Sequence, residues 1–316
     1  MNRQVKPRQI LLSKRANVFY LEHVRVMQKD NRIVYLTDTG EDVERYFNIP
    51  ERNTAFVLLG KGTSITDAAA RRMAESNVLV GFCGSGGSPL FSSVDQVFLS
   101  PQSEYRPTEY MQAWVKTWFD EPKRLDLAKA LLQKRLDWAM EAWDENIELI
   151  RNGIKIDDGL AAGFSAQINA AQNTETLLLA EARWAKALYA RLAEGVGLHK
   201  FVREEGKGKQ ESREDIVNGF IDHGNYIAYG YAAVVLNGLG ISFSLPLLHG
   251  KTRRGALVFD VADLIKDAHV MPLAFLFGEL KISQKDFRNA LIETCQKKDV
   301  LDKVFTFVAD FAKKIL

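Results

Sequence analysis

Cysteine is scarce in this chain: Cys83 and Cys295 are the only two among 316 residues. They lie far apart, without the close spacing of a redox motif or a cysteine metal site, so we expect both thiols to be reduced and buried. Long uncharged apolar runs are also missing, and alternating apolar residues follow the basic first segment where a secretion signal would have a continuous apolar core. The sequence therefore predicts a cytoplasmic protein with no membrane contact.

A strong net charge is lacking as well, because 42 Lys and Arg residues offset 40 Asp and Glu residues to leave a formal charge of +2. Overall charge therefore does not indicate a nucleic-acid-binding protein, and any such function must depend on a local patch. With 47% hydrophobic and 26% charged residues, the composition is that of a globular protein with one large or two modest domains.

The first hundred residues contain short apolar segments typical of strands. Segments 17–28 and 32–37 flank a Lys-Asp-Asn turn and predict a hairpin, and two further strands are expected at 54–60 and 78–84. Between these two, the pattern predicts a helix with Ser64 as its N-cap and an acidic residue three positions later, as in a capping box. The sequence thus predicts a small β-rich domain with one helix.

After about residue 107, long segments with a 3.6-residue apolar period replace the strand signals, at 107–143, 174–197 and 283–316. The charged segment 201–215 has no apolar period and predicts an exposed loop. We therefore predict an α+β protein, with an N-terminal β domain at 1–98 and a larger all-α domain at 99–316.

One acidic residue is out of place in the expected helix at 177–194. At 100° per residue, Glu181 falls within the apolar stripe that includes Leu177, Trp184 and Leu188. An unpaired buried carboxylate costs several kcal/mol. Glu181 therefore needs a cation, which is either a buried arginine or a metal ion.

A second group of acids lies in an apolar segment near the C-terminus. Asp260, Asp263 and Asp267 are spaced three and four residues apart, so a helix places them on one face. Neighbouring carboxylates repel one another unless positive charge lies between them. His249 precedes the group, and imidazole with carboxylates suits Mn²⁺ or, with water and phosphate oxygens, Mg²⁺. We interpret Asp267 as structural, for example paired with Lys266.

Basic residues lie between His249 and the acids, and their positions favour phosphate as the ligand. Lys251, Arg253 and Arg254 are candidates to hold phosphate oxygens. The Gly-Lys-Thr at 250–252 is not a nucleotide-binding P-loop, because that motif needs a glycine where Leu245 stands.

Each of these residues also has an ordinary structural interpretation. Asp260 and Asp263 fit a solvated helix face or an N-cap, and His249 fits a core histidine. Outside this group, Arg15 is a candidate DNA contact or a solvated surface charge, and Trp114 is a candidate for DNA stacking or for core packing.

Several motifs together resemble the CRISPR spacer-acquisition integrase family over nearly the whole chain. The glutamate in AEARWAKALY, the histidine in LLHGKTRRG and the aspartates in VFDVAD look like the metal-binding set of that family. The segment FIDHGNYIAYGYAAVVLNGLGI resembles the helix that contributes an asparagine and a tyrosine, here Asn225 and Tyr229. The segments LSKRANVFYLEHVRV, GTSIT, GFCGSGG and SEYRPTEYMQAW are similar to the subtype I-F variant.

This resemblance implies a function, a site and partners. The function is that of a metal-dependent DNA endonuclease and integrase, which inserts short fragments into a CRISPR array by 3′-hydroxyl attack on target phosphodiesters. The metal ligands would be Glu181, His249 and Asp263, and the adjacent Asp260 would tune or share the Mg²⁺ or Mn²⁺ ion. Expected partners are double-stranded and branched DNA, a second copy joined through the β domain, and a second adaptation protein fused to a helicase-nuclease.

Two alternatives remain at this point. A non-catalytic DNA-binding or scaffold subunit would use its acids only in internal ion pairs. A prenyl-diphosphate-type enzyme would need a second acidic cluster with matching spacing, which the sequence lacks.

Overall fold

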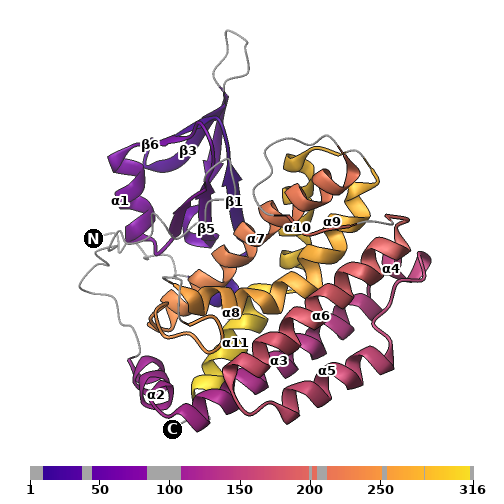
Figure 1. The fold of residues 1–316 in the computed structure, drawn as a ribbon. Helices are drawn as coiled ribbons and strands as arrows, with labels where there is room; N and C mark the ends of the chain where they lie inside the picture. The colour runs from indigo at the N-terminus through magenta and orange to yellow at the C-terminus, as the bar shows by residue number, and fades with distance from the viewer. Residues whose placement is uncertain are drawn as a thin grey trace. The chain divides into compact units, whose positions relative to one another are not determined.

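The computed structural model describes residues 10–37, 45–83, 108–198, 201–204, 212–250, 255–280 and 282–313. They form two compact units, one within residues 10–83 and one within residues 108–313 (Figure 1). The first unit is rich in strands and the second is helical, which confirms the predicted α+β class. The predicted boundary between residues 98 and 99 lies outside the described residues and stays a prediction.

The N-terminal unit contains two sheets. One has the parallel order β1-β5-β7 and the other the order β4-β3-β2-β6. The strands are β1 (Asn17–Leu21), β2 (Val24–Lys29), β3 (Arg32–Thr37), β4 (Arg45–Ile49), β5 (Thr54–Leu59), β6 (Ser64–Ile65) and β7 (Leu79–Phe82). Two 3₁₀ turns, η1 (Leu12–Lys14) and η2 (Glu51–Asn53), complete the unit together with helix α1 (Asp67–Glu75).

The predicted hairpin is confirmed, because β2 and β3 pair antiparallel around Asp30 and Asn31. Both turn residues have positive φ, 47° and 63°, as a two-residue hairpin turn of the primed type requires. Strand β1 belongs to the other sheet, and His23, between the two strands, has a φ of 54° that an extended strand does not adopt. A single long strand over 17–28 is therefore not formed.

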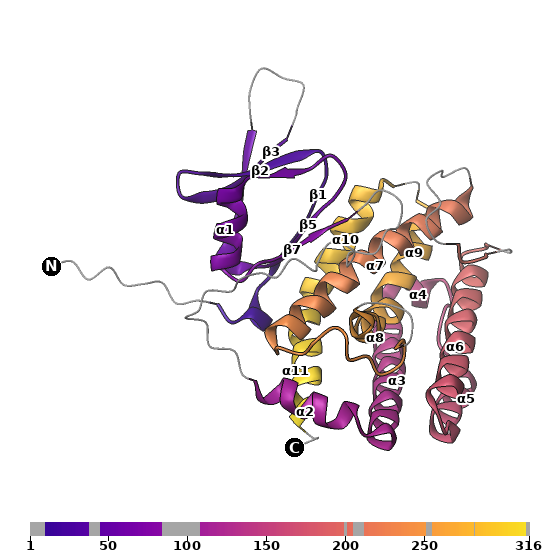
Figure 2. The same cartoon turned by 60° about the vertical axis from the view of Figure 1, so that its left-hand side comes forward.

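The helix of this unit begins later than predicted. Thr66 is the N-cap of α1 and accepts a hydrogen bond from the backbone of Ala69, whereas Ser64 lies in β6, paired with β2. The capping-box prediction was wrong because residues 64–65 extend a sheet edge before the helix can start. The helix packs against β2, β3 and β7 (Figure 2) and buries Ala69 and Met73 in the unit's apolar core.

Arg15 is neither an exposed DNA contact nor a solvated surface charge, the two roles that the sequence suggested. It is 5% exposed, and its Nη1 donates to the backbone carbonyls of Thr54 and Asn77 at 2.9 and 3.0 Å. Arg15 therefore fastens the chain start to β5 and to the loop before β7.

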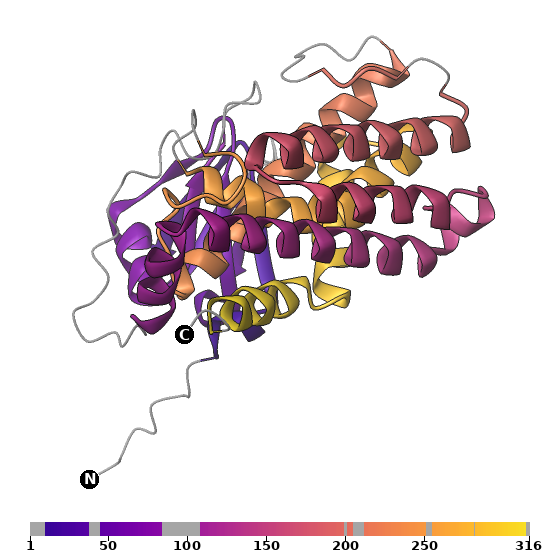
Figure 3. The ribbon, with the colours of Figure 1, turned by 60° about the horizontal axis from the view of Figure 1, so that its bottom comes forward.

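The second unit is built almost entirely from helices. They are α2 (Glu109–Trp118), α3 (Glu121–Asp144), α4 (Ile147–Arg151), α5 (Asp158–Ala170), α6 (Thr174–Gly195), α7 (Arg213–Gly238), α8 (Ala256–Ile265), the π-helical turn η4 (Lys266–Val270), α9 (Met271–Gly278), α10 (Gln284–Lys297) and α11 (Val300–Lys313). Helices α3, α5 and α6 lie side by side (Figure 3).

The centre of this unit is formed by α7 and α8. Every residue of α8 is buried, and α7 contacts α8, α9, α10 and α11. Close approach requires a small residue at Gly224, where a Cβ atom would lie 2.4 Å from Cγ1 of Val270. The acids of the 260–267 segment are thus enclosed by protein, as their apolar neighbours predicted. No helix in the described part of the chain has the length and apolar character needed to span a bilayer.

Both cysteines are free and buried, as predicted, and Trp114 is 2% exposed in the core of the helical unit. Core packing therefore accounts for Trp114. The predicted loop at 201–215 lies partly outside the described residues, and its last positions, Arg213 to Asp215, already belong to α7.

Candidate metal centre

His249 lies in the irregular loop between α7 and α8, and Asp260 fixes it there. Oδ2 of Asp260 accepts hydrogen bonds from the backbone N–H groups of Leu247 and Leu248 at 2.7 and 3.1 Å. Oδ1 lies 2.7 Å from Nδ1 of the His249 ring. Because Nδ1 is engaged by the carboxylate, Nε2 is the nitrogen left to bind a metal ion.

The pKa of His249 reflects this environment. Burial alone lowers it, but the hydrogen bond to Asp260 and the negative charges of Asp263, Asp260 and Glu181 outweigh that effect and raise the pKa above its ordinary value. The site therefore attracts positive charge at this position.

Asp263 projects from α8 between two cations. Lys266 Nζ lies 2.8 Å from its Oδ1, and Arg135 Nη1 lies 3.3 Å from its Oδ2. Burial raises the pKa of this carboxyl, but the charges of Lys266 and Arg135 more than compensate and hold the pKa below its usual value. Asp263 is therefore ionised at neutral pH in spite of its burial.

Glu181 projects from α6, whose bounds confirm the helix predicted around it. Its side chain is 16% exposed, and its Oε1 accepts a hydrogen bond from Arg135 Nη1 at 2.8 Å. The buried arginine considered for Glu181 is thus present, and it leaves the other carboxylate oxygen of Glu181 available to a metal ion.

Asp267 is structural, as interpreted, but its partner is not Lys266. Arg135 donates from Nε and Nη2 to the two carboxylate oxygens at 2.6 and 3.0 Å, and Trp184 Nε1 donates at 2.7 Å. Trp143 also donates, from Nε1 to the backbone carbonyl of Asp267. The prediction of a Lys266 partner was wrong because the π-helical turn aims Asp267 at α3, and Lys266 pairs with Asp263 instead.

Of the two α7 residues of the family motif, Tyr229 is the one that contacts a residue of the site. Tyr229 hydrogen-bonds to Lys266, whose Nζ lies 4.6 Å from the centre of the tyrosine ring. Tyr229 thus reaches Asp263 through Lys266. Asn225 lies one turn earlier on α7 and is partly buried.

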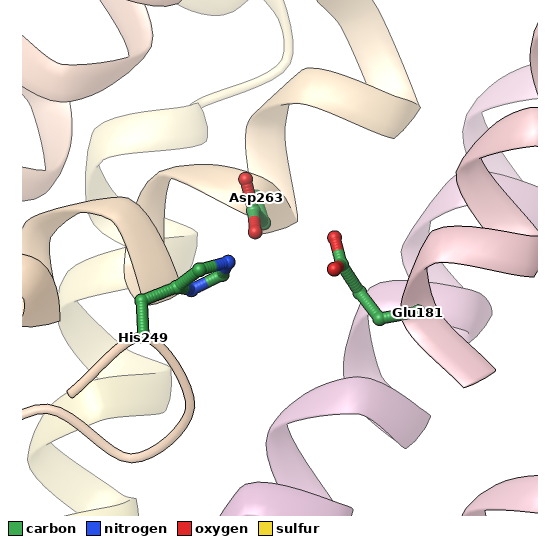
Figure 4. Close-up of side chains that lie close together, drawn as sticks. All are labelled: Glu181, His249 and Asp263. Carbon is green, nitrogen blue, oxygen red and sulfur yellow. The ribbon is translucent and has the colours of Figure 1, made fainter. Parts of the chain in front are cut away.

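Glu181, His249 and Asp263 converge from α6, the loop and α8 (Figure 4). One ligand atom from each of these three lies within 4.8 Å of the others. An ion with metal–ligand bonds of about 2.1 Å holds its ligands roughly 3 to 4 Å apart. The three ligand atoms would therefore approach one another by up to roughly 1 to 2 Å to share one ion, and water or phosphate oxygens would fill the rest of its coordination shell.

The formal charges of the group fit one divalent cation. Glu181, Asp260, Asp263 and Asp267 contribute four negative charges, and the buried cations Arg135 and Lys266, whose pKa values are raised by these acids, return two. Among the described residues, two negative charges are left unbalanced when His249 is in the neutral form that binds a metal ion, and one when the histidine carries its proton. Uncompensated buried charge is costly, so a doubly charged ion is the complement that the cluster needs.

Arg135 is the functional residue that sequence reasoning missed. It is 2% exposed and lies in the buried stripe of α3, between Leu132 and Leu136. A charged residue within an apolar stripe is the signal that revealed Glu181, and it applies equally here. The candidate phosphate contacts Lys251, Arg253 and Arg254 lie outside the described residues and stay predictions.

Comparison with known proteins identifies the family. The family model described as "CRISPR associated protein Cas1" matches residues 19–307. The chain belongs to the Cas1 family. A Cas1 relative from Pseudomonas aeruginosa, named CRISPR-associated endonuclease Cas1, is 46% identical over 96% of this chain and 95% of its own length. A protein of the same name from Pectobacterium atrosepticum is 43% identical, over 97% and 95%.

Solved Cas1 structures share the fold. A Cas1 protein from Thermotoga maritima superposes with a TM-score of 0.70 at 16% identity, covering 95% of this chain and 97% of that one. The structure titled "Crystal structure of TtCas1-DNA complex" gives a TM-score of 0.67 at 22% identity, over 93% and 91%. A structure titled "Casposase bound to integration product" gives 0.71 at 14% identity, over 94% and 90%.

Proposed function

We propose that this Cas1 protein is a metal-dependent DNA endonuclease and integrase that inserts short DNA fragments into a CRISPR array. The observation that supports the proposal most strongly is the convergence of Glu181, His249 and Asp263 within a cluster whose described residues leave part of its negative charge unbalanced. The names of the relatives, and the titles of structures that contain DNA or an integration product, agree with it.

Glu181, His249 and Asp263 would hold one Mg²⁺ or Mn²⁺ ion, since carboxylate oxygens with one imidazole suit either. When bound, the ion would polarise the target phosphodiester and stabilise the negative charge that develops on its oxygens during attack. Asp260 would hold the imidazole in the tautomer and orientation that a metal ligand requires.

The remaining residues would prepare the site for DNA. Arg135 and Lys266 offset part of the negative charge of Glu181 and Asp263 before the ion arrives. Lys251, Arg253 and Arg254, which follow His249 in sequence, would position phosphate groups without reading bases. The reaction exchanges one phosphoester for another as a 3′-hydroxyl attacks, so it needs no external energy source.

The scaffold alternative gains one observation, since three of the four acids have ion-pair partners within the protein. It leaves part of the negative charge of the described cluster without a balancing cation. The prenyl-diphosphate alternative fares worse, because among the described residues Glu181, His249 and Asp263 form the only group of acids and histidines arranged to hold a metal ion.

The test is to measure Mn²⁺ binding by calorimetry and cleavage or joining of branched DNA with the purified chain. Glu181→Gln and Asp263→Asn should abolish both, whereas Glu194→Gln, an exposed substitution on the same helix as Glu181, should change neither. Metal-independent DNA binding without turnover would favour the scaffold alternative. Full activity in both site variants would refute the assignment.

Homodimerisation through the β domain, the second adaptation protein fused to a helicase-nuclease, and the cytoplasmic location stay predictions. Each follows from the resemblance or from the composition, and gel filtration with co-purification would test the first two.

A further inference from the structure

The loop that carries His249 has no regular secondary structure, yet side chains hold five consecutive backbone positions. Trp114 Nε1 donates to the carbonyl of Leu245 at 3.0 Å, and Trp118 Nε1 donates to the carbonyl of Pro246 at 2.8 Å. The next three N–H groups, at 247–249, all donate to Asp260. The loop is therefore held between α2 and α8.

One peptide group in this loop is held from both ends. The bond between Pro246 and Leu247 presents its carbonyl to Trp118 and its N–H to Asp260. Because the peptide unit is planar, two such hydrogen bonds fix its orientation, and His249 follows only two residues later. Pro246 has no N–H of its own, so its carbonyl is the backbone group through which it can be held by hydrogen bonding.

The two indoles are themselves fixed. Trp114 and Trp118 are four residues apart on α2 and therefore share a face of the helix. Trp114 is buried against Phe311, with ring centres 6.1 Å apart. The guanidinium group of Arg124 lies 5.2 Å from the Trp118 ring centre, and its Nη1 donates to the Trp118 carbonyl at 3.0 Å.

We propose that Trp118, assisted by Trp114, is a positioning residue for metal binding: it fixes the Pro246–Leu247 peptide and through it the His249 ring. The inference depends on the proposed function, in which His249 is a metal ligand. Asp260 fixes the ring directly at Nδ1, whereas Trp118 acts on the backbone that carries it.

The experiment compares Trp118→Phe with Trp138→Phe. Phenylalanine keeps an aromatic ring beside Arg124 but removes the N–H donor. Trp138 is an equally half-buried indole on α3 that packs on Phe307, with ring centres 5.8 Å apart, and it is the matched control. Circular dichroism establishes that both variants are folded.

Two measurements follow. Hydrogen–deuterium exchange of the metal-free chain should be faster at residues 247–249 in Trp118→Phe and unchanged in the control. The Kd for Mn²⁺, measured by calorimetry, should rise roughly three- to tenfold in Trp118→Phe, which is the effect of one lost neutral hydrogen bond on an equilibrium constant.

The outcomes separate this inference from the proposed function. Wild-type exchange and wild-type Kd in Trp118→Phe would overturn the role of Trp118. Absence of Mn²⁺ binding in the wild-type chain would overturn the proposed function, while the exchange data would still report whether Trp118 holds the loop.

Discussion

Replacing Arg135 by methionine removes the cation that links three elements of the helical unit. Its guanidinium group makes four hydrogen bonds, to Asp267 at 2.6 and 3.0 Å, to Glu181 at 2.8 Å and to Asp263 at 3.3 Å. The side chain is 3% exposed, so water cannot replace these bonds. Breaking a buried ion pair by removing one partner costs about 3–5 kcal/mol, and we expect a loss of unfolding free energy in this range.

A second substitution tests whether charge is the reason. Asp267 is fully buried and would keep Trp184 as its side-chain donor, so most of the penalty should come from its orphaned charge. Adding Asp267→Asn to Arg135→Met should therefore recover about 1–3 kcal/mol, the coupling expected for residues in one ion-pair network. If the losses of unfolding free energy measured for Arg135→Met and Asp267→Asn alone simply add in the double variant, this explanation is contradicted.

The assay is guanidinium unfolding in the presence of a chelator, followed by tryptophan fluorescence. Arg151→Met, which removes an exposed pair with Glu148, is the control, and it should change the unfolding free energy by less than about 1 kcal/mol. If Arg135→Met is as mild as this control, the reasoning about the buried counter-charge is refuted.

Further predictions concern the histidine clamp, the core and the thiols. Asp260→Asn should weaken Mn²⁺ binding about 10- to 100-fold in calorimetry, because it removes the partner that orients the ligand histidine; unchanged affinity would contradict that role. Gly224→Ala should lower the unfolding free energy by about 1–3 kcal/mol through the clash with η4, and an unchanged denaturation midpoint would show that η4 can yield. Burial, with the positive charges of Lys303 and Lys298, lowers the pKa of His269 to about 4. The imidazole takes up a proton at higher pH in the unfolded chain than in the folded one. The free energy of unfolding should therefore fall by up to about 3 kcal/mol as the pH drops from about 6.5 to about 4. In His269→Gln, the free energy of unfolding should depend less steeply on pH over that range. Burial also raises the pKa of Cys295 to about 12, so its thiol should react with a maleimide only after unfolding, as peptide mass analysis would detect.

Much of the fold could be predicted from the sequence because buried apolar residues recur at regular spacing in helices and strands. The helix around Glu181, the hairpin at Asp30 and Asn31, and the buried segment after Ala256 all follow from apolar spacing or turn chemistry. Strand β4 was missed, since four of its five residues are exposed and it pairs only with β3, at the sheet edge. Its large side chains Tyr46 and Phe47 are exposed neighbours, so they do not follow the alternation of buried and exposed residues by which a strand is recognised.

Sequence spacing singled out the three side chains that converge, Glu181, His249 and Asp263, but not the cations that balance their charge. Sequence spacing cannot show that Arg135 reaches residues 46, 128 and 132 positions further along the chain. Nor can it show that a π-helical turn aims Asp267 at α3 while Lys266 turns to Asp263. These contacts depend on how four separate segments pack, which is a property of the folded unit alone.

The wide separation of the ligands along the chain carries a consequence for synthesis in the cell. A nascent chain that has emerged only as far as α7 already contains Arg135 and Glu181 but lacks His249 and Asp263. Such a fragment can neither chelate an ion nor cut DNA by the proposed chemistry. The order of the elements thus delays assembly of the candidate metal centre until α8 has emerged from the ribosome.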